Sequence, residues 1–288
     1  MPRISVIIPS YNTPENHLMK LYNTLLAQSL QDFEVIIVDD CSESDFYDII
    51  TDPRFRILKT PKNGGPAKAR NLGAENALSH NLFFTDSDCS FPEDTLAEVE
   101  KGLLSNDIIM GNTVTKTETV LGKAVAYLGF PGGGNIGFEN VWRVDSDGFT
   151  DSISSCNLAI KKDVFQNMGM FDTSFPVPGG EDTYFAKKTI AQNGKIRYNR
   201  CQVVFHVERG SFKSFLRWQI TRGRGNFHIK RKLGSVGGFY KLRLWSFGNS
   251  LIKSGLYFPL VAFLIVVSFL WQKKGYNLEK KSYKEIQI

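Results

Sequence analysis

The sequence has few cysteines, only four among 288 residues, and they are widely scattered. Their spacing fits neither a zinc site nor the dense framework of a small disulfide-rich domain, so we expect reduced thiols in a cytosolic setting. The chain also opens without the apolar stretch and small-residue cleavage site of a secretory signal. The length suits one large α/β domain plus an appendage.

Acidic residues are missing from 209–253, a stretch that holds eleven lysines and arginines. The part of the chain before it is net acidic, although the whole carries +6. This asymmetry predicts that the basic segment contacts an anionic partner. We do not expect that partner to be nucleic acid, because the segment has no recognisable reading motif and leads into an apolar stretch.

That apolar stretch, Ser254–Trp271, has no charged residue. As a helix it would be about 27 Å long, close to the hydrocarbon thickness of a bilayer. Lysines flank it, and Tyr257 and Trp271 occupy interface-like positions. We expect it to span a membrane or to lie in its interface, with an anionic membrane surface as partner. A buried core helix is the alternative.

Apolar runs and helix signals alternate over the first ninety residues. The expected strands are Ile4–Pro9, Phe33–Val38, Phe55–Leu58 and Leu82–Thr85. The expected helices between and after them begin near Pro14, Asp45, Pro66 and Pro92. Strands that alternate with helices predict βαβ units and a doubly wound sheet.

The second half of the chain is patterned less regularly. Five glycines and a proline in Gly129–Gly137 predict a mobile loop. Further on we expect a strand at Ser154–Ile160, a helix at Glu181–Gln192, a short strand at Val203–His206 and a basic amphipathic helix from Ser211 to about Arg222.

Polar side chains follow three of the expected strands. They are Pro9-Ser10-Tyr11-Asn12, Asp39-Asp40 and Asp86-Ser87-Asp88. Ligands of open α/β sheets bind beyond the carboxyl ends of the strands, so these groups are expected to face one crevice. The glycine-rich phosphate loops of dinucleotide and P-loop proteins are absent. A phosphate ligand would therefore need a cation between itself and these carboxylates.

The Asp-Ser-Asp triplet occurs twice, so the triplet alone does not identify a binding site. The second copy, Asp145-Ser146-Asp147, follows no uninterrupted apolar strand, precedes Gly148, and lacks the further acids of a calcium loop. We expect a surface turn there and a binding site at the first copy.

Six segments together resemble glycosyltransferase family 2, a group of inverting enzymes with the GT-A fold. In chain order they read ISVIIPSYN, LLAQSLQDFEVIIVDDCS, NGGPAKARNLG, FFTDSDCSFPED, SSCNLAIKKDVFQNMGMFD and GGEDTYFAKKTIAQNG. The resemblance implies a GT-A type, Rossmann-like, doubly wound mixed sheet in a domain at 1–210. Its nucleotide-binding half would be 1–90 and its acceptor half 91–210. A basic helical segment (211–253), a transmembrane or interfacial helix (254–271) and a charged tail (272–288) would follow.

The resemblance also implies roles for matching residues on the donor side. The nucleotide would contact the following residues: Pro9, Tyr11, Asp39, Asp40, Arg70 and Asp86. Asp88 would bind Mn²⁺ or Mg²⁺, with Asp86 beside it and His206 completing the metal site. Oxygen ligands plus one imidazole suit either ion, which would neutralise the leaving diphosphate.

On the acceptor side the resemblance implies that the Gly-Glu-Asp segment faces the acceptor, with Asp182 as general base. Because Glu181 and Asp182 are adjacent, one of them can orient the acceptor while the other accepts the proton. A carboxylate in hydrogen-bonding reach can take the proton of the attacking hydroxyl. Both residues are expected at the start of a helix, where the positive end of the dipole would lower their pKa and keep them ionised.

The segment Gln219-Ile220-Thr221-Arg222-Gly223 resembles the Q-x-x-R-W of processive polysaccharide synthases, with Gly in place of Trp. This departure, together with a single long apolar segment, argues against a processive enzyme. We expect Arg222 or Arg224 to reach the donor diphosphate or an anionic lipid-linked acceptor.

These features predict a non-processive inverting glycosyltransferase that moves a hexosyl or N-acetylhexosaminyl group. We expect a UDP-linked donor and a glycan or lipid-linked acceptor of the cell envelope. The catalytic domain would lie in the cytoplasm, at the inner face of the plasma membrane. The alternatives are a nucleotidyltransferase that makes a nucleotide sugar, a processive polysaccharide synthase subunit, and a non-catalytic membrane-bound scaffold.

Overall fold

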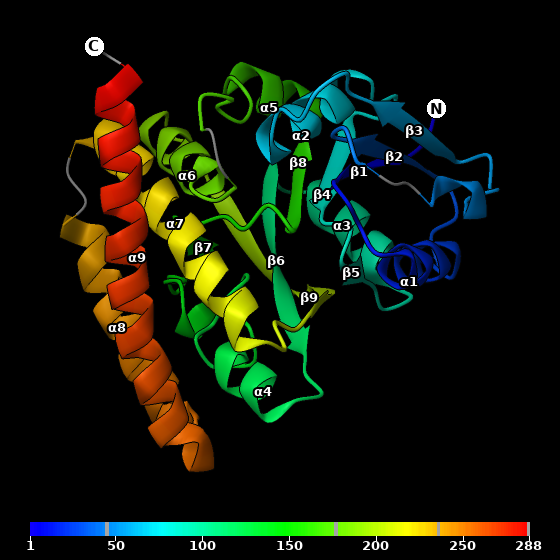
Figure 1. Ribbon diagram of the computed structural model, residues 1–288. Coiled ribbons are helices and arrows are strands. Elements are labelled where there is room, and N and C mark those ends of the chain that lie inside the picture. Colours follow the sequence, from blue (N-terminus) through cyan, green and yellow to red (C-terminus); the bar gives the residue numbers. More distant parts are fainter. Residues whose placement is uncertain (44–45, 176–177, 235–236, 287–288) are drawn as a thin grey trace.

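The computed structural model describes residues 1–43, 46–175, 178–234 and 237–286. Asp45, where we expected a short helix to begin, and the last two residues of the charged tail lie outside these ranges. A mixed sheet runs through the centre of the molecule, and three long C-terminal helices gather at one side of it (Figure 1).

The described residues form a nine-stranded sheet in the order β3-β2-β1-β4-β8-β6-β9-β5, with β7 paired to β9. Its first strands are β1 (Ile4–Ser10), β2 (Phe33–Asp39), β3 (Phe55–Lys59) and β4 (Asn81–Thr85). These four are parallel, and β8 (Asn157–Lys161) then runs antiparallel to β4. The predicted doubly wound mixed sheet is therefore confirmed.

The remaining strands are β5 (Cys89–Ser90), β6 (Ile108–Lys116), β7 (Phe149–Thr150) and β9 (Ile196–Val207). The short strand expected at 203–206 is thus the end of a longer one. Cys89 of β5 pairs with His206 of β9, so the chain just after β4 is tied to the end of β9. This pairing positions the site described below.

Alternating side chains of the central strands build a core on each face of the sheet. Ile7 and Phe84 point into one cluster, Val6 and Phe83 into the other. The helices that cover the faces are α1 (Glu15–Leu26), α2 (Pro66–Glu75), α3 (Thr95–Leu103), α4 (Val120–Ala126), α5 (Lys162–Asn167) and α6 (Glu181–Ala191). Short 3₁₀ turns occupy Tyr47–Ile49 and Phe138–Asn140.

The glycine-rich segment Gly129–Gly137, expected to be a mobile loop, packs into the core. Phe130 and Ile136 are buried. At Gly134, where φ is +53°, an added Cβ would lie 2.2 Å from the carbonyl oxygen of Ala126. The glycines thus allow backbone segments to approach closely, and the segment forms a wall of the cavity described below.

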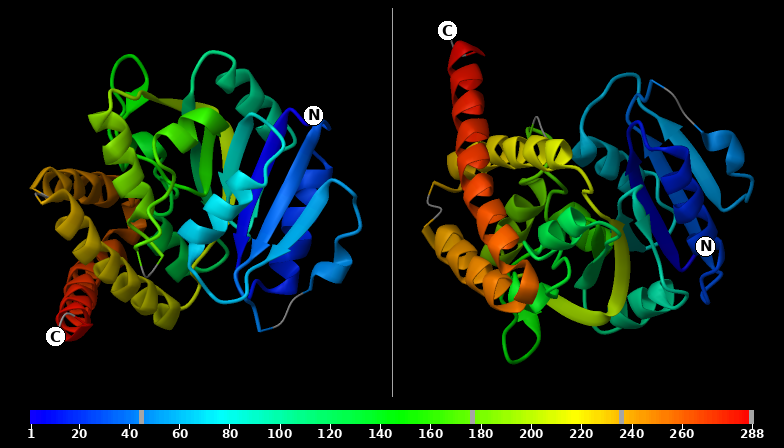
Figure 2. Two further views of the ribbon diagram at one scale, coloured as in Figure 1. Left: turned by 90° about the horizontal axis from the view of Figure 1, so that it is seen from above. Right: turned by 60° about the horizontal axis from the view of Figure 1, so that its bottom comes forward.

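The chain ends in α7 (Phe212–Leu233), α8 (Gly237–Lys253), a 3₁₀ turn (Gly255–Tyr257) and α9 (Phe258–Ile286). The basic helix expected to stop near Arg222 therefore continues for three further turns. Most of the apolar stretch and the described part of the charged tail form one helix, α9. Figure 2 shows the three long helices together, on the opposite side of the molecule from β1–β3.

Helix α9 is fixed to α7 by two close backbone contacts. A Cβ on Gly223 would lie 2.1 Å from the carbonyl oxygen of Gln272, and one on Gly275 would lie 2.1 Å from that of Ile220. Within the described residues, one helix, 255–285, is long and apolar enough to cross a membrane. Only 28% of its most apolar stretch is buried. Most of this apolar surface is therefore not covered by the rest of the protein, as it would be in a buried core helix.

Candidate active site

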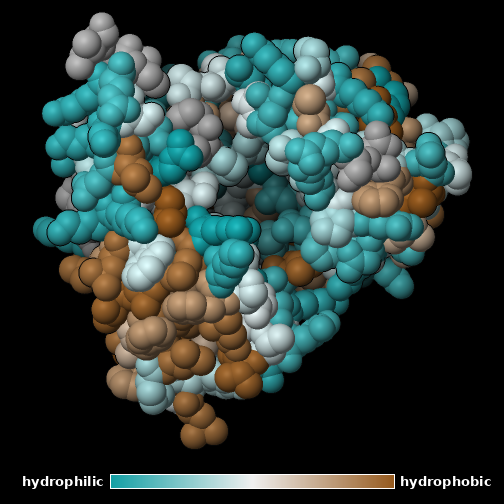
Figure 3. Space-filling view, in the orientation of Figure 1, coloured by the Kyte–Doolittle hydropathy of each residue, from teal (hydrophilic) through white to brown (hydrophobic). Residues whose placement is uncertain are grey.

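A cavity of about 770 Å³ opens at the carboxyl ends of the central strands. Its walls come from the chain after β1 and β4, the glycine-rich segment at 130–132, the start of α6, one side of α7, and Arg243 of α8. Figure 3 shows this hollow near the centre of the face drawn there. The volume is within the range of about 300–1,000 Å³ typical of small-molecule sites.

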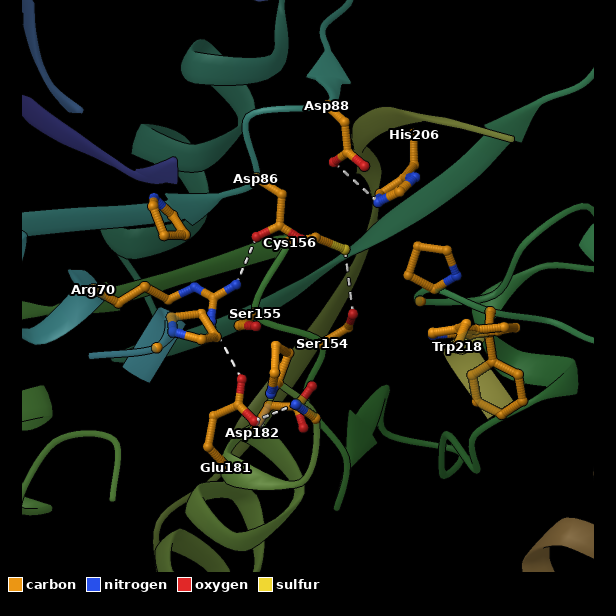
Figure 4. Close-up of a pocket in the computed structure, with 18 of the residues that line it drawn as sticks. Arg70, Asp86, Asp88, Ser154, Ser155, Cys156, Glu181, Asp182, His206 and Trp218 are labelled. Carbon is orange, nitrogen blue, oxygen red and sulfur yellow. Dashed lines mark hydrogen bonds and ion pairs between the residues drawn. The ribbon is translucent and has the colours of Figure 1, made fainter. Parts of the chain in front are cut away.

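Asp88 and His206 meet at one side of the cavity. The His206 Nε2 lies 3.2 Å from the Asp88 Oδ1, and Nδ1 lies 2.8 Å from the carbonyl oxygen of Val207. If Nδ1 donates to that carbonyl, as its geometry favours, the lone pair of Nε2 faces Asp88 and the cavity. The pair is therefore arranged as a carboxylate and an imidazole that could share a cation (Figure 4).

Cys89 completes the group of metal-capable side chains found among the described residues, Asp88, Cys89 and His206. Burial raises the pKa of the Cys89 thiol well above its usual value, with nearby Asp88 adding to the effect. A thiol held protonated is a poor ligand. The oxygen and nitrogen donors that are left suit Mg²⁺ or Mn²⁺.

Arg70 lies buried between two carboxylates on the other side of the cavity. Its Nη2 is 2.6 Å from the Asp86 Oδ1, and its Nη1 is 3.3 Å from the Glu181 Oε1. Figure 4 shows Arg70 between these acids, with Asp88 and His206 beyond Asp86. Asp86 is thus directed to Arg70 rather than included in the Asp88–His206 group, and its predicted role as a metal ligand stays a prediction.

Glu181 and Asp182 open α6, as expected, but their electrostatics differ from the expectation. Burial raises the pKa of Glu181 to about 7, against the opposing effects of Arg70 and of the Gly179 N–H that donates to Glu181. Burial also raises the pKa of Asp182. The prediction that the helix dipole lowers both pKa values is wrong, because loss of solvation outweighs the dipole at this depth.

The residues expected to hold the nucleotide lie around the mouth of the same cavity, with one exception. Pro9 and Tyr11 line it, and the Tyr11 side chain is half exposed. Asp40 lines it too, and its carboxylate accepts hydrogen bonds from the N–H groups of Gly64 and Gly65. Asp39 is buried, accepts from Ser42, and is not part of the lining.

A family model described as glycosyl transferase family 2 matches residues 5–166, more than half of the chain. The chain belongs to this family. The predicted resemblance is thereby confirmed, and the matched region carries β1 to β4 with Asp86 and Asp88 at the end of β4, both of which line the cavity.

Relatives and solved structures agree with this family assignment. An uncharacterized glycosyltransferase of Haemophilus influenzae is 38% identical over 115 residues, which are 38% of this chain and 46% of that protein. The matched stretch spans still less of two rickettsial relatives. The glycosyltransferase AglE of Haloferax volcanii is 26% identical over 241 residues, 80% of this chain and 74% of AglE.

A solved structure with the same fold is the mannosyltransferase PcManGT of Pyrobaculum calidifontis, determined with GDP-Man and Mn²⁺. The TM-score is 0.61 at 20% identity, over 100% of this chain and 81% of that one. The family 2 chain described here therefore has the GT-A fold.

Sequence reasoning missed several cationic and aromatic groups that line the cavity of this family 2 member. The missed lining residues are His17, Trp142, Arg209, Trp218 and Arg243. Arg209 stacks 4.9 Å from the Trp218 ring centre. The one signal in the sequence was the absence of acids from 209–253. It indicated that this segment is cationic but did not identify which of its arginines line the cavity.

Arg222 lines the cavity as expected, whereas Arg224 is held elsewhere. The guanidinium of Arg222 lies 4.0 Å from the centre of the Phe130 ring, and burial lowers the pKa of Arg222 to about 10. Arg224 pairs instead with Glu279 on α9, at 2.5 Å. The sequence did not decide which of these two arginines lines the cavity, and the structure shows that it is Arg222.

The second Asp-Ser-Asp triplet is a surface turn, as predicted. The Asp145 carboxylate accepts hydrogen bonds from the N–H groups of Asp147 and Phe149, at 3.0 and 2.8 Å. Asp145 and Asp147 are exposed. This carboxylate serves its own turn, and the triplet after β4 is the one that faces the cavity.

Proposed function

We propose that this family 2 protein transfers a sugar, with inversion, from a nucleoside diphosphate donor to a hydroxyl of an acceptor. One observation carries the proposal. The Asp88–His206 pair and the Asp182 carboxylate open on the same cavity, at the carboxyl ends of the strands. A cation site and a proton acceptor that face one space are what direct displacement of a diphosphate by a hydroxyl requires.

On the donor side, Asp88 and His206 would hold Mn²⁺ or Mg²⁺. Once bound, the ion supplies positive charge that stabilises the departing diphosphate. Burial lowers the pKa of Arg209, and the nearby charges of Asp88 and Asp86 oppose this effect. Arg209 can therefore add a second positive charge beside the diphosphate. The nucleotide would lie against Pro9, Tyr11 and Asp40.

On the acceptor side, Asp182 would take the proton of the attacking hydroxyl. Its Oδ1 accepts the N–H of Thr183 at 2.7 Å, which fixes the carboxylate at the start of α6. Because burial raises the pKa of Asp182, its carboxylate is a stronger base than an exposed aspartate and is better matched to neutral pH. Glu181, paired with Arg70, would hold Asp182 in position.

Donor and metal binding can be tested together by thermal shift with UDP, GDP and their sugars in the presence of Mn²⁺. A ligand at 100 times its Kd adds about 2.7 kcal/mol to the stability of the folded state. We expect wild type to be stabilised by one nucleotide series, UDP in our prediction, and Asp88→Asn and His206→Ala to lose the Mn²⁺-dependent part.

Asp145→Asn is the matched control, because it alters the same triplet at the surface turn. It should behave as wild type. Wild type that responds to no nucleotide with Mn²⁺, or Asp88→Asn that keeps the full response, would contradict the proposal. Release of pyrophosphate from a nucleoside triphosphate and a sugar phosphate would instead identify a nucleotidyltransferase.

The proposal extends to the place of the reaction, an anionic membrane surface at the cytoplasmic face, with a lipid-linked or envelope glycan as acceptor. It is supported by an apolar surface on α8, α9 and the 3₁₀ turn between them, where the following residues are exposed: Leu244, Trp245, Ile252, Leu256, Phe258, Phe263, Val266, Phe269 and Leu270. Figure 3 shows the hydrophobic colouring concentrated over the lower part of these helices. Lys253, Lys273 and Lys274 lie at its ends.

This apolar surface favours an interfacial helix over a spanning one, because α9 stays joined to α7 by the glycine contacts and only its outer side is free. Co-sedimentation with vesicles tests it. We expect binding to vesicles that contain anionic lipid, and a loss of binding in Phe263→Glu. Leu104→Glu, at an exposed leucine of the α3 end, is the control. Equal binding by both variants would contradict the assignment.

A further inference from the structure

A chain of three hydrogen bonds between hydroxyl groups ends at the cavity. The Tyr47 hydroxyl donates to the Ser10 Oγ at 2.9 Å. The Ser10 Oγ lies 2.9 Å from the Thr13 Oγ1, which lies 2.7 Å from the Ser87 Oγ. Tyr47 begins the 3₁₀ turn after β2, Ser10 ends β1, and Ser87 follows β4. Ser10, Thr13 and Ser87 all line the cavity, so the chain of hydroxyls joins three strand ends at the site.

The first hydroxyl of the chain sets its direction. Burial raises the pKa of Tyr47 to about 12, so the phenol is protonated at neutral pH and gives its hydrogen to Ser10. Ser10 is only 2% exposed, and Thr13 is the one further partner of its hydroxyl among the residues that the structure describes. A buried donor left without an acceptor costs about 1–3 kcal/mol. Ser10 therefore donates to Thr13.

The same direction continues from Thr13 to Ser87. A hydroxyl carries one hydrogen and two lone pairs, and a hydroxyl that accepts a hydrogen bond becomes a better donor. Thr13 accepts from Ser10 and so donates to Ser87. Within the described parts of the chain, the Ser87 hydroxyl has no second partner. Its own hydrogen is therefore left for a ligand in the cavity that Ser87 lines.

Ser87 offers this hydrogen between two carboxylates. Asp86 is held by Arg70, and Asp88 lies against His206. Ionised carboxylates only accept hydrogen bonds. The phosphate oxygens of a nucleotide also accept, and its ribose hydroxyls can do so, which means that they need a donor or a cation beside these acids. Asp88 and His206 would hold the cation, and Ser87 supplies a donor.

We propose that the Ser87 hydroxyl donates a hydrogen bond to an oxygen of the donor nucleotide, and that Thr13 orients it for this contact. The inference rests on the proposed transferase function and adds a binding residue and a positioning residue to it. Because Thr13 holds the hydroxyl in one rotamer before the nucleotide arrives, less freedom is lost on binding. The oxygen can belong to the ribose or to the diphosphate, and the experiment separates the two.

The experiment measures the affinity for UDP, or for GDP if that is the donor nucleotide, by isothermal titration calorimetry at saturating Mn²⁺. Ser87→Ala should weaken binding by about two- to tenfold if its partner is a ribose oxygen, and by about tenfold or more if it is a charged phosphate oxygen. The 2′,3′-dideoxy nucleotide decides between them. It should bind equally to wild type and Ser87→Ala in the first case, and more weakly to Ser87→Ala in the second.

The positioning role is tested by combining variants. Thr13→Val keeps the shape of the side chain and removes its hydroxyl, so it should weaken binding by a smaller factor than Ser87→Ala. Thr13→Val/Ser87→Ala should bind no more weakly than Ser87→Ala alone, because Thr13 acts through Ser87. Thr13→Ser keeps the hydroxyl and should retain the wild-type affinity. A merely structural role of Thr13 would instead give losses that add.

Two hydroxyls away from the cavity provide matched controls. Ser146→Ala changes the middle residue of the second Asp-Ser-Asp triplet, which is exposed. Thr24→Val removes a hydroxyl that donates to backbone carbonyls within α1. Both variants should bind the nucleotide as wild type does.

Three outcomes would overturn the proposal. Ser87→Ala that binds the nucleotide as tightly as wild type shows that no such hydrogen bond is made. A higher Mn²⁺ requirement in Ser87→Ala would assign its loss to a displaced Asp88. Additive losses in the double variant exclude Thr13 as the positioning residue. If wild type binds no nucleotide at all, the proposed function fails first, and this result is distinct from the other three.

Discussion

Replacing Arg70 by Met should destabilise the fold in a way that depends on pH. The Arg70 and Glu181 side chains are only 5% and 4% exposed, and Asp86 is 28% exposed. Removing one partner of a buried ion pair leaves an uncompensated charge and costs about 3–5 kcal/mol. That is a large part of the stability of a typical protein, about 5–15 kcal/mol. We expect a loss in this range at pH 8.

The loss should be smaller at pH 5.5. Glu181 has a pKa of about 7 in the folded protein, above the ordinary value of 4.5. The folded state therefore binds more protons than the unfolded state between these values, and the stability that this group confers declines as the pH rises through that window. Without Arg70 the pKa rises further. At pH 5.5, which is below the folded-state pKa, Glu181 is neutral in the folded variant, and the variant no longer buries a bare carboxylate.

Urea unfolding followed by circular dichroism at the two pH values measures both effects. Arg70→Met/Glu181→Gln should recover much of the loss at pH 8, because the uncompensated charge is gone. Arg3→Met, which breaks an ion pair whose arginine is 54% exposed, should cost at most about 1 kcal/mol at either pH. A loss at Arg70 below about 1 kcal/mol, or one equal at both pH values, would refute the reasoning.

Three further results are expected. Asp182→Asn should lower the transfer rate by about 10²- to 10⁴-fold, with nucleotide binding measured by thermal shift unchanged; near-normal turnover would exclude Asp182 as the base. Gly223→Ala should cost about 1–3 kcal/mol in urea unfolding, because its Cβ would meet the Gln272 carbonyl oxygen at 2.1 Å. Gly248→Ala, in the interior of α8 with nothing within 4 Å of its Cβ, should instead be neutral or stabilising by about 0.5–1 kcal/mol, and a similar loss in both variants would count against the close α7–α9 contact.

The sheet and the wall of the cavity at its strand ends were predictable because strand ends are local signals. Three of the four apolar runs were followed directly by polar residues, and most of these line the cavity, such as Asp86 and Asp88 after β4. The carboxyl ends of parallel strands meet at one edge, so a correct set of strands brings those residues together. Asp39 is the exception. It ends β2, yet its side chain turns inward to Ser42, and no sequence pattern distinguishes it from the adjacent Asp40.

The opposite wall of the cavity was predictable only in part, because it is assembled from segments far apart in the chain. Phe130 comes from a glycine-rich segment that looked like a loop, and Arg222 and Arg243 come from two different C-terminal helices. The basic composition of 209–253 indicated cations somewhere. Which of them are buried depends on how α7, α8 and α9 pack, and that packing rests on contacts such as Gly223 against Gln272.

Burial also explains why the electrostatics of Glu181 and Asp182 were misjudged. Their position at the start of a helix was read correctly from the sequence, and a dipole at an exposed helix start favours a charged carboxylate by about 0.3–1 kcal/mol. Moving a carboxylate out of water costs more than this, and the depth of a side chain is a property of the whole fold. The direction of the two pKa shifts was therefore predicted wrongly because the burial of these side chains could not be known from the sequence. A raised pKa suits the proposed role of Asp182 as general base better than a lowered one. It brings the pKa nearer to neutral pH, where the carboxylate can both accept a proton and release it.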